Sequence, residues 1–234
     1  MINKAFDNDM IGAHALKAFK KAKKLLKKNA NVRDRILNRD EYRRLMERLP
    51  PHTRAIISIA IHTGMRKGET LSLTWDKVDL KNRIIRLAAS DTKDREPRKI
   101  PISDDLYNVL KGIPRAIHDS HVILFDGKPI RDIRAALVTA CKKEGISYGR
   151  FVKGGFVFHD FRHTFNTNMR KAGVAQSVIM KITGHSTNEM FERYNTVDED
   201  DIRQAVDRME GYLKSVDQNV DQYPNSSAIK NKKD

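Results

Sequence analysis

The chain has 234 residues, of which 39% are hydrophobic, enough for one substantial domain with a buried core and short appendages. Its 45 lysines and arginines against 30 acidic residues give a net charge of +15 and an isoelectric point near 9.9, which favours a polyanionic partner, nucleic acid above all. No apolar run approaches the ~20 residues that cross a bilayer, no secretion signal is evident, and the lone Cys141 excludes an internal disulfide. These features predict a cytoplasmic protein without membrane contact.

We expect residues 1–30 to be an appendage to the main domain. They carry eight lysines, and Leu16, Phe19 and Leu26 are spaced to lie along one side of a helix interrupted near Gly12. This charge run is typical of a solvated face, and contact with a nucleic acid is the alternative.

From residue 31 to 213 the pattern predicts a compact domain. Asn38 is a candidate N-cap with Glu41 at the capping-box position, and apolar residues recur at helical spacing up to Pro50-Pro51. A second helix is expected over 53–63, ended by Gly64, and another near Lys67.

The stretch 78–102 changes period and predicts two or three short antiparallel strands. Its apolar residues lie in short segments separated by polar residues and Pro97: Val78, Ile84, Ile85, Leu87, Ile100 and Ile102. Residues 89–96 form the expected exposed turn of a hairpin, with Lys93 at its tip.

Helical patterns return over 104–112, 130–144, 159–172, 175–182, 187–194 and 199–213, separated by glycines. The predicted fold class is therefore mostly α with a small antiparallel β-sheet (α+β). Residues 214–234 are polar and lysine-rich at the end, and we expect them to be disordered.

Three short segments stand out by their order: Thr63-Gly64-Met65-Arg66-Lys67-Gly68-Glu69, then His159-Asp160-Phe161-Arg162-His163, then Gly184-His185 followed by Tyr194. With Lys93 between the first two, they make the chain resemble the tyrosine recombinase (phage integrase) family over residues 33–212. The resemblance implies that family's DNA breaking-rejoining catalytic fold.

The resemblance implies that Arg66 and Arg162 bind the DNA phosphate to be cleaved. Guanidinium groups suit this task because their planar fork donates paired hydrogen bonds to phosphate oxygens, where charge develops during phosphoryl transfer. Glu69 follows Arg66 by three residues, so on a helix it orients that arginine.

The two histidines of the motifs are expected to act on the same phosphate. His159 shares a helical face with Arg162, and its ordinary pKa of ~6.5 suits a group that accepts the proton of a tyrosine. His185 matches the family's second histidine, in Thr-Gly-His, and would hydrogen-bond the phosphate. His163 points elsewhere on the helix, so we expect a structural role.

Tyr194 matches the family's nucleophile, which forms a 3′-phosphotyrosyl bond with DNA and leaves a 5′-hydroxyl. Lys93 matches the lysine that protonates the departing oxygen. The hairpin also holds Arg95 and Lys99, which are rivals for that role, and Arg95, Arg98 and Lys99 are candidate DNA-binding residues. No metal and no cofactor is expected, since the tyrosyl bond stores the energy for rejoining.

Family members carry a helical DNA-clamping domain before the catalytic one, and residues 1–30 are expected to be a remnant or linker of it. The resemblance further implies double-stranded DNA as partner and a homotetramer on DNA that uses residues 199–213, with accessory DNA-bending proteins as optional partners. A bacterial or phage-encoded protein associated with the nucleoid is expected, acting in site-specific recombination or integration.

Three other readings stay open. A type IB topoisomerase shares the arginine, lysine, histidine and tyrosine set, although the Thr-Gly-Met-Arg and Gly-His segments favour a recombinase. A metal-dependent hydrolase would use His159 and His163 at zinc-ligand spacing, without a well-spaced third ligand. A non-catalytic DNA-binding relic is the third, because the clamp is absent.

Overall fold

The computed structural model describes residues 2–25, 35–185 and 199–221, and the chain divides into two compact units, Met1–Arg33 and Asp34–Asp234. The first unit contains helices α1 (Ile2–Asp7) and α2 (Ala13–Leu25). The break between them covers residues 8–12 and ends at Gly12, near which the sequence predicts an interruption.

Three helices open the second unit: α3 (Arg39–Arg48), α4 (Pro51–Thr63) and α5 (Lys67–Leu71). The predicted capping box is confirmed, because the Glu41 amide donates to Asn38 Oδ1 at 2.8 Å and the Asn38 amide donates to Glu41 Oε2 at 3.1 Å. The central helix of the unit is α4. Its isoleucines Ile56, Ile57 and Ile59 are fully buried, so it contacts the core on most of its circumference.

The predicted small sheet is also present. Strands β1 (Val78–Asp79), β2 (Ile84–Leu87) and β3 (Arg98–Pro101) form an antiparallel sheet in the order β1-β2-β3, and Ile85 pairs with Ile100. Alternate residues point inward, as expected of strands with one covered face. Short 3-10 helices, Trp75–Lys77 and Ala89–Asp91, flank the sheet segments.

Between α6 (Asp104–Lys111) and α7 (Arg134–Lys143) lies a two-stranded hairpin, β4 (Leu124–Phe125) and β5 (Lys128–Pro129), that the sequence reading missed. Asp126 and Gly127 both have positive φ in its turn, and this dipeptide is a recognised hairpin signal. The expected helix from residue 130 starts later, because the Asp132 carboxylate accepts the Ile133 and Arg134 amides and begins α7 there.

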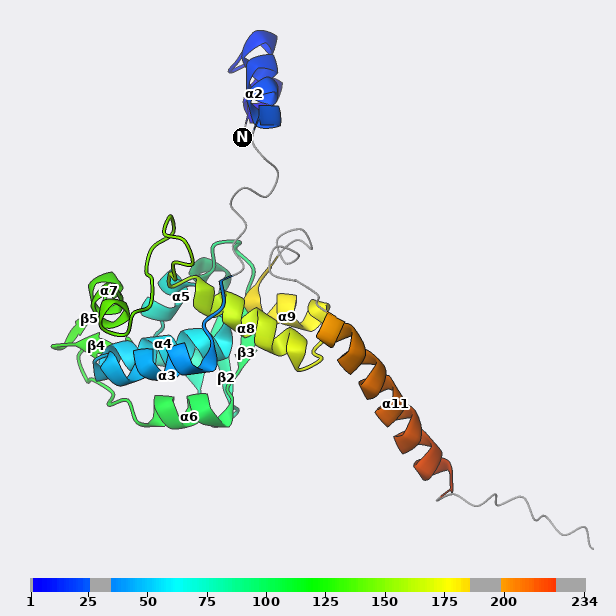
Figure 1. Ribbon diagram of the computed structural model, residues 1–234. Coiled ribbons are helices and arrows are strands. Elements are labelled where there is room, and N and C mark those ends of the chain that lie inside the picture. The colour runs from blue at the N-terminus through cyan, green and yellow to red at the C-terminus, as the bar shows by residue number, and fades with distance from the viewer. Residues whose placement is uncertain (1, 26–34, 186–198, 222–234) are drawn as a thin grey trace, which may run out of the picture. The chain divides into compact units, whose positions relative to one another are not determined.

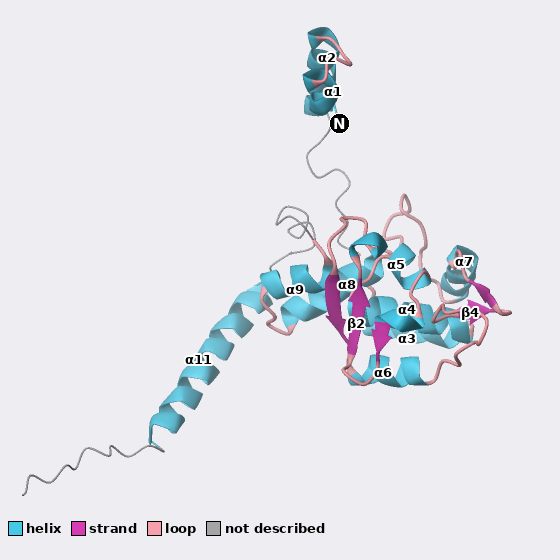
Figure 2. Cartoon of the chain, turned by 180° about the vertical axis from the view of Figure 1, so that it is seen from behind, coloured by secondary structure: helices cyan, strands magenta, loops and turns pink. Residues whose placement is uncertain are grey.

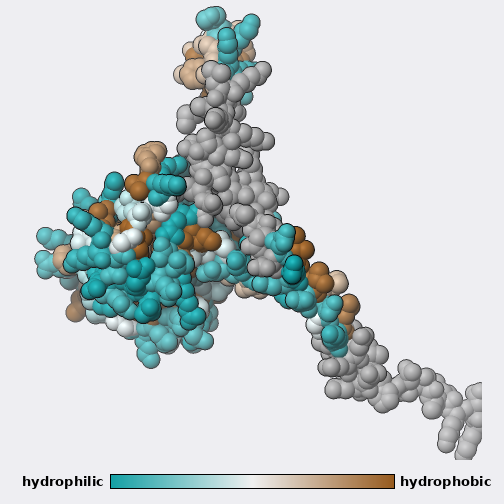
Figure 3. All heavy atoms as spheres, in the orientation of Figure 1, coloured by the Kyte–Doolittle hydropathy of each residue, from teal (hydrophilic) through white to brown (hydrophobic). Residues whose placement is uncertain are grey.

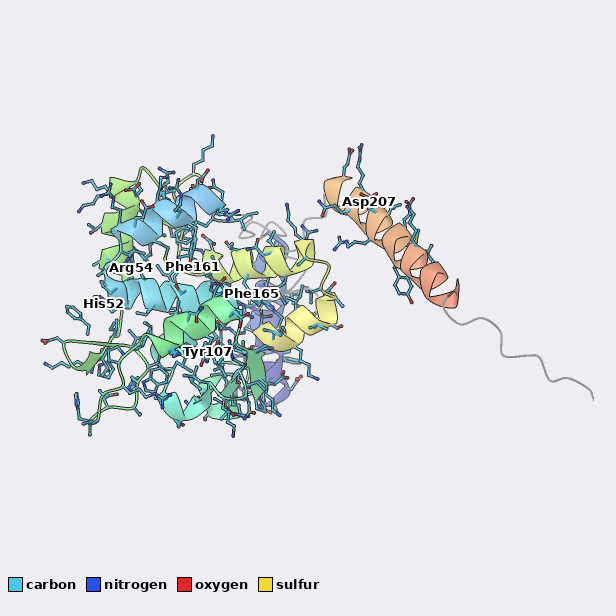
Figure 4. The ribbon with its side chains drawn as sticks, turned by 90° about the horizontal axis from the view of Figure 1, so that it is seen from below. His52, Arg54, Tyr107, Phe161, Phe165 and Asp207 are labelled. Carbon is cyan, nitrogen blue, oxygen red and sulfur yellow. The ribbon has the colours of Figure 1, made fainter. Side chains whose placement is uncertain are left out.

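Helix α8 (Asp160–Lys171) packs on α4, and α9 (Gln176–Thr183) packs on α8 and β3. Figure 4 labels Phe161 and Phe165 on α8, the helix that packs on α4, and Figure 2 shows the sheet and α6 from behind. The predicted boundaries of both helices agree within about a residue. Cys141 is fully buried on α7, and burial raises the pKa of its thiol to about 11.

The last described helix, α11 (Glu199–Asp221), is longer than predicted. The expectation of disorder from residue 214 is wrong up to Asp221. Apolar residues recur every three or four positions, and this spacing continues past Leu213 with Val216 and Val220, which favours a continuous helix. The predicted helix 187–194 and the rest of the tail lie outside the described residues.

Candidate active site

The corner after α4 depends on a glycine. Gly64 has a φ of +64°, and a Cβ there would lie 2.7 Å from Phe165 Cδ1 and 2.9 Å from Thr183 Cγ2. Side chains of α8 and α9 therefore reach the backbone at this corner. Arg66 follows as the N-cap of α5. The Thr-Gly-Met-Arg segment therefore places this arginine next to the corner where side chains of α8 and α9 contact the end of α4.

The guanidinium of Arg66 has three partners. Its Nη1 donates to Glu69 Oε1 at 3.0 Å, and its Nη2 donates to Asp94 Oδ2 at 2.6 Å and to the Gly184 carbonyl at 3.3 Å. The Arg66 amide also donates to Glu69 Oε2 at 2.8 Å. The structure thus brings the two predicted partners Arg66 and Glu69 together, and it adds Asp94, which the sequence reading did not single out.

Arg98 lies inside the fold. It is 7% exposed, and its Nη2 donates to the Glu69 carboxylate. The cause is strand alternation, because β3 points residues 98 and 100 inward and Lys99 outward. The position of Arg98 therefore disfavours the predicted direct DNA contact and makes it a second cation on Glu69. Arg95 and Lys99 are exposed.

Arg162 and His185 meet in the interior. Arg162 is 2% exposed and His185 6%, although arginine is rarely buried without partners. Arg162 Nη1 donates to the Gly64 carbonyl at 2.8 Å, and its Nη2 lies 3.1 Å from His185 Nε2. Arg66 reaches the neighbouring Gly184 carbonyl, so both arginines and His185 converge on the corners at Gly64 and Gly184.

The contacts of His185 determine its tautomer. Arg162 has only donor hydrogens, so His185 Nε2 accepts from it. The proton then resides on Nδ1, which lies 2.8 Å from Thr183 Oγ1, and that hydroxyl donates to the Ile179 carbonyl at 2.8 Å. Thr183 therefore holds the imidazole in one orientation and one protonation form.

Burial, with positive charge from Arg162 and then Arg66, lowers the pKa of His185 to about 3. The pKa of His159 falls to about 4 for the same reasons, with burial of the ring first and Arg162 second. Both imidazoles are thus neutral at pH 7. A phosphate anion placed between them and the arginines offsets this positive charge and raises both pKa values.

His159 is the N-cap of α8, three residues before Arg162, and part of its surface is exposed although its ring lies deep enough to be desolvated by the surrounding protein. Its ring meets that of His163 edge to face, with 5.7 Å between centroids. His163 is 5% exposed, in keeping with the structural role expected for it. His159 therefore lies at the surface above the buried arginine.

Lys93 is exposed in the segment that joins β2 to β3, next to Asp94. Thr92 Oγ1 donates to the Glu96 carbonyl at 3.0 Å, so the turn has a defined shape. Tyr194 lies outside the described residues, and its role as the nucleophile stays a prediction.

An open cleft of about 620 Å³ borders His185 on the side of β3 and α9. Its lining includes the exposed Lys181 and the edge of Arg98. Among residues 2–25, 35–185 and 199–221, no cluster of three or more histidine, cysteine or acidic residues could hold a metal ion, and no helix is long and apolar enough to span a membrane.

The phage integrase family matches residues 35–201, well over half of the sequence, so the chain belongs to this family. The integrase of Salmonella phage P22 is 27% identical over 180 residues, covering 70% of this chain and 44% of that protein. The shufflon-specific DNA recombinase of Escherichia coli is 27% identical over 171 residues, covering 71% and 41%. The chain spans less than half the length of these two relatives.

Solved structures agree on the fold, the tyrosine recombinase catalytic fold. The catalytic domain of bacteriophage HP1 integrase superposes with a TM-score of 0.53 at 28% identity, covering 68% of this chain and 85% of that one. XerA recombinase gives a TM-score of 0.62 at 22% identity, covering 84% and 73%. The Tn1549 transposon integrase, solved in complex with transposon right end DNA, gives 0.61 at 21%, covering 80% and 70%.

Proposed function

We propose that this protein is a tyrosine recombinase that carries out site-specific DNA recombination or integration, cutting and rejoining strands through a 3′-phosphotyrosyl bond. The observation that carries the proposal is the convergence of Arg66, Arg162 and His185 at two glycine corners. Preorganised donors of this kind stabilise charge that develops on a phosphate in the transition state. Family membership supports the same conclusion.

In the proposed reaction, Arg66 and Arg162 donate hydrogen bonds to the scissile phosphate, and the phosphate charge raises the pKa of His185 so that its protonated Nε2 donates to the same phosphate. The Tyr194 hydroxyl attacks phosphorus, and the bond from phosphorus to the 5′-oxygen breaks. His159 takes the tyrosine proton, for which its neutral form is suited, and Lys93 gives a proton to the leaving oxygen. Rejoining is the reverse attack by a 5′-hydroxyl on the phosphotyrosine, so the proposed reaction requires neither ATP nor a metal.

Double-stranded DNA is the proposed substrate. The net charge of +15 supports it, because phosphate neutralisation dominates the affinity of proteins for DNA. Lys93, Arg95 and Lys99 are exposed on the β2–β3 side of the candidate site and are proposed DNA contacts. The protein would act in the cytoplasm on nucleoid DNA.

We also propose a homotetramer on DNA, with accessory DNA-bending proteins as optional partners. Helix α11 supports self-association, because its stripe of apolar side chains is about half exposed or more: Ile202, Val206, Met209 and Leu213. A groove of about 710 Å³ between the 36–42 segment and α8, lined in part by Ile36, Leu37 and Phe165, is the proposed receptor for α11 of another copy. Sedimentation of Val206→Asp beside Gln204→Asp, on the opposite helix face, tests this contact.

The decisive experiment detects the covalent intermediate. The protein is mixed with a library of nicked duplexes of randomised core sequence, in which the nick lets the 5′-hydroxyl strand diffuse away, and adducts are separated on a denaturing gel. The wild type should form adducts in EDTA, and sequencing the trapped strands then reports the preferred site. Tyr194→Phe should form none, since it lacks the attacking oxygen.

Other outcomes separate the alternatives. DNA binding without any adduct would establish a non-catalytic relic. Adducts accompanied by plasmid relaxation, with no products that join two sites, would indicate a topoisomerase. A requirement for added metal would contradict the proposed chemistry.

A further inference from the structure

A loop between α7 and α8 exposes an aromatic side chain almost completely. In the segment Gly149-Arg150-Phe151-Val152-Lys153, the Phe151 side chain is 95% exposed and Val152 is 49% exposed. The loop forms the projection above α5 in Figure 1 and again in Figure 2, and Figure 3 shows apolar surface at its end. Exposure of a phenylalanine to water is unfavourable, so a partner that covers it gains free energy.

The loop has a defined shape. Phe156 donates its amide to the Ser147 carbonyl at 2.7 Å, and Gly149 donates back to the Phe156 carbonyl at 2.9 Å, which closes the base. A Cβ on Gly155 would lie 2.2 Å from the Gly149 carbonyl oxygen, so only glycine permits this closure. The Arg35 Nε–H donates to the Gly154 carbonyl at 3.1 Å and fixes the outer turn.

The base of the loop is anchored in the core beside the candidate site. Phe156 is fully buried, and its ring packs edge to face on Phe161 of α8 with 4.9 Å between centroids. Phe156 precedes His159 by only three positions in the chain. Arg150 is one of the cations that lower the pKa of His159, so its charge lies close to the site. The loop therefore holds its exposed tip at a fixed place near the proposed phosphate.

The charges on the loop indicate what covers it. Arg150 and Lys153 flank the two apolar residues and are exposed, and residues 147–158 contain no acidic side chain. A DNA groove matches this pattern, because its sugars and base edges accept apolar side chains while phosphates on both rims take the cations. The apolar surface of the tip is small, which fits a groove better than a protein interface.

We propose that the loop Gly149–Lys153 is a DNA-binding element that places Phe151 and Val152 against the sugars and base edges of a groove next to the cleaved phosphate. Arg150 and Lys153 contact phosphates on either side. This inference rests on the proposed function for the identity of the partner.

The test measures binding of a fluorescein-labelled duplex of mixed sequence by fluorescence anisotropy over a range of salt concentrations. Phe151→Ala should weaken binding about tenfold, as loss of a buried apolar side chain predicts, and leave the salt dependence unchanged. Lys153→Gln should reduce the slope of log affinity against log salt by about 0.9, the value for one lost phosphate contact. Both variants should melt at the wild-type temperature.

Two matched controls lie away from the loop. Ile117 is fully exposed between α6 and β4, and Lys111 is exposed on α6. Ile117→Ala and Lys111→Gln should bind DNA as the wild type does. If Phe151→Ala binds no more weakly than Ile117→Ala, the proposal is wrong. Loss of binding to vesicles of anionic phospholipid without loss of DNA binding would likewise overturn it, in favour of a membrane surface.

The DNA-binding role of the loop and the proposed recombinase chemistry can be disproved independently of each other. If the wild type forms covalent adducts and Phe151→Ala binds DNA normally, only the loop assignment falls. If the wild type binds DNA through Phe151 but forms no adduct, the loop assignment stands and the recombinase chemistry falls.

Discussion

The two sides of the candidate site are built differently. Arg162 and His185 lie in the core, 2% and 6% exposed, and hydrogen bonds to neighbouring helices fix their directions. Lys93 lies on an exposed turn, where Asp94 is the residue that ties the turn to Arg66. The groups proposed to bind the phosphate are therefore preorganised by folding, whereas the group proposed to donate the proton depends on a local turn and on DNA.

This difference follows from what each group must do. A buried guanidinium is costly unless it has hydrogen-bond partners, and Arg162 donates to the Gly64 carbonyl and to His185. Such an arrangement cannot rearrange cheaply, which suits a binding group. A proton donor on a surface turn, by contrast, has to reach the leaving oxygen only when DNA is bound.

The largest effect should come from Arg162→Lys. Lysine keeps the positive charge, but one ammonium cannot replace both hydrogen bonds of the planar guanidinium. We expect adduct formation to fall about 1000-fold and the free energy of unfolding to fall by about 1–3 kcal/mol. Gel quantification of adducts and urea denaturation measure the two effects.

The exposed Arg54 on α4 provides the control for Arg162. Arg54→Lys should change neither adduct formation nor stability beyond about 0.5 kcal/mol. Adduct formation by Arg162→Lys within tenfold of wild type would contradict the idea that the buried side is preorganised for phosphate.

Lys93→Ala tests the exposed side. Adduct formation should fall about 100-fold, because the leaving 5′-oxygen loses its proton donor, while the melting temperature stays unchanged. A substrate with sulfur in place of that oxygen should restore the rate, since a thiolate leaves without a proton. Lys99→Ala, also exposed, should show no such sulfur-specific rescue. If sulfur fails to rescue Lys93→Ala, another group is the acid.

Local signals predicted most of the fold. Three of these signals each depend on only a few neighbouring residues, and the structure contains all three. They are the Asn38 capping box, the alternation of buried and exposed residues in β2 and β3, and the glycine with positive φ at position 64. The convergence of Arg66, Arg162 and His185 was expected only through the family resemblance. Helical or strand periodicity relates residues a few positions apart, and these three are much farther apart in the chain.

What the sequence reading missed depends on tertiary contacts. Asp94 is next to Lys93 in the sequence, but nothing local shows that it reaches Arg66 across the fold. The burial of Arg98 follows from the register of β3, which the sequence left open. Thr183 is the first residue of the Thr-Gly-His segment, although its bond to His185 Nδ1 became evident only from the geometry.

Thr183→Val tests how strongly adduct formation depends on the one hydroxyl that orients His185 on the buried side. Valine has nearly the same shape but cannot accept a hydrogen bond from His185 Nδ1–H, so the other tautomer competes, and in that tautomer Nε2 cannot accept from Arg162. Adduct formation should fall about tenfold. Thr183→Ser, which keeps the hydroxyl, should restore the rate. Equal loss in both variants would mean that the methyl group, through packing, is what matters.

The smallest effect is expected for Asp94→Asn, which is also the only variant predicted to increase the affinity for DNA. In the free protein the Asp94 carboxylate occupies one Nη of Arg66 at 2.6 Å, and a phosphate must displace it to use the same donor. Asparagine keeps the shape of the side chain and removes the competing charge, so affinity for the mixed-sequence duplex should rise about threefold.

Asp91→Asn is the matched control for this gain, because Asp91 lies in the same segment but pairs with Lys77 at 2.6 Å. A general effect of removing one negative charge near DNA would raise affinity equally in both variants. A larger gain in Asp94→Asn means that Asp94 competes with phosphate for Arg66. Weaker binding would instead mean that Asp94 supports Arg66, and the exposed side would then be as preorganised as the buried one.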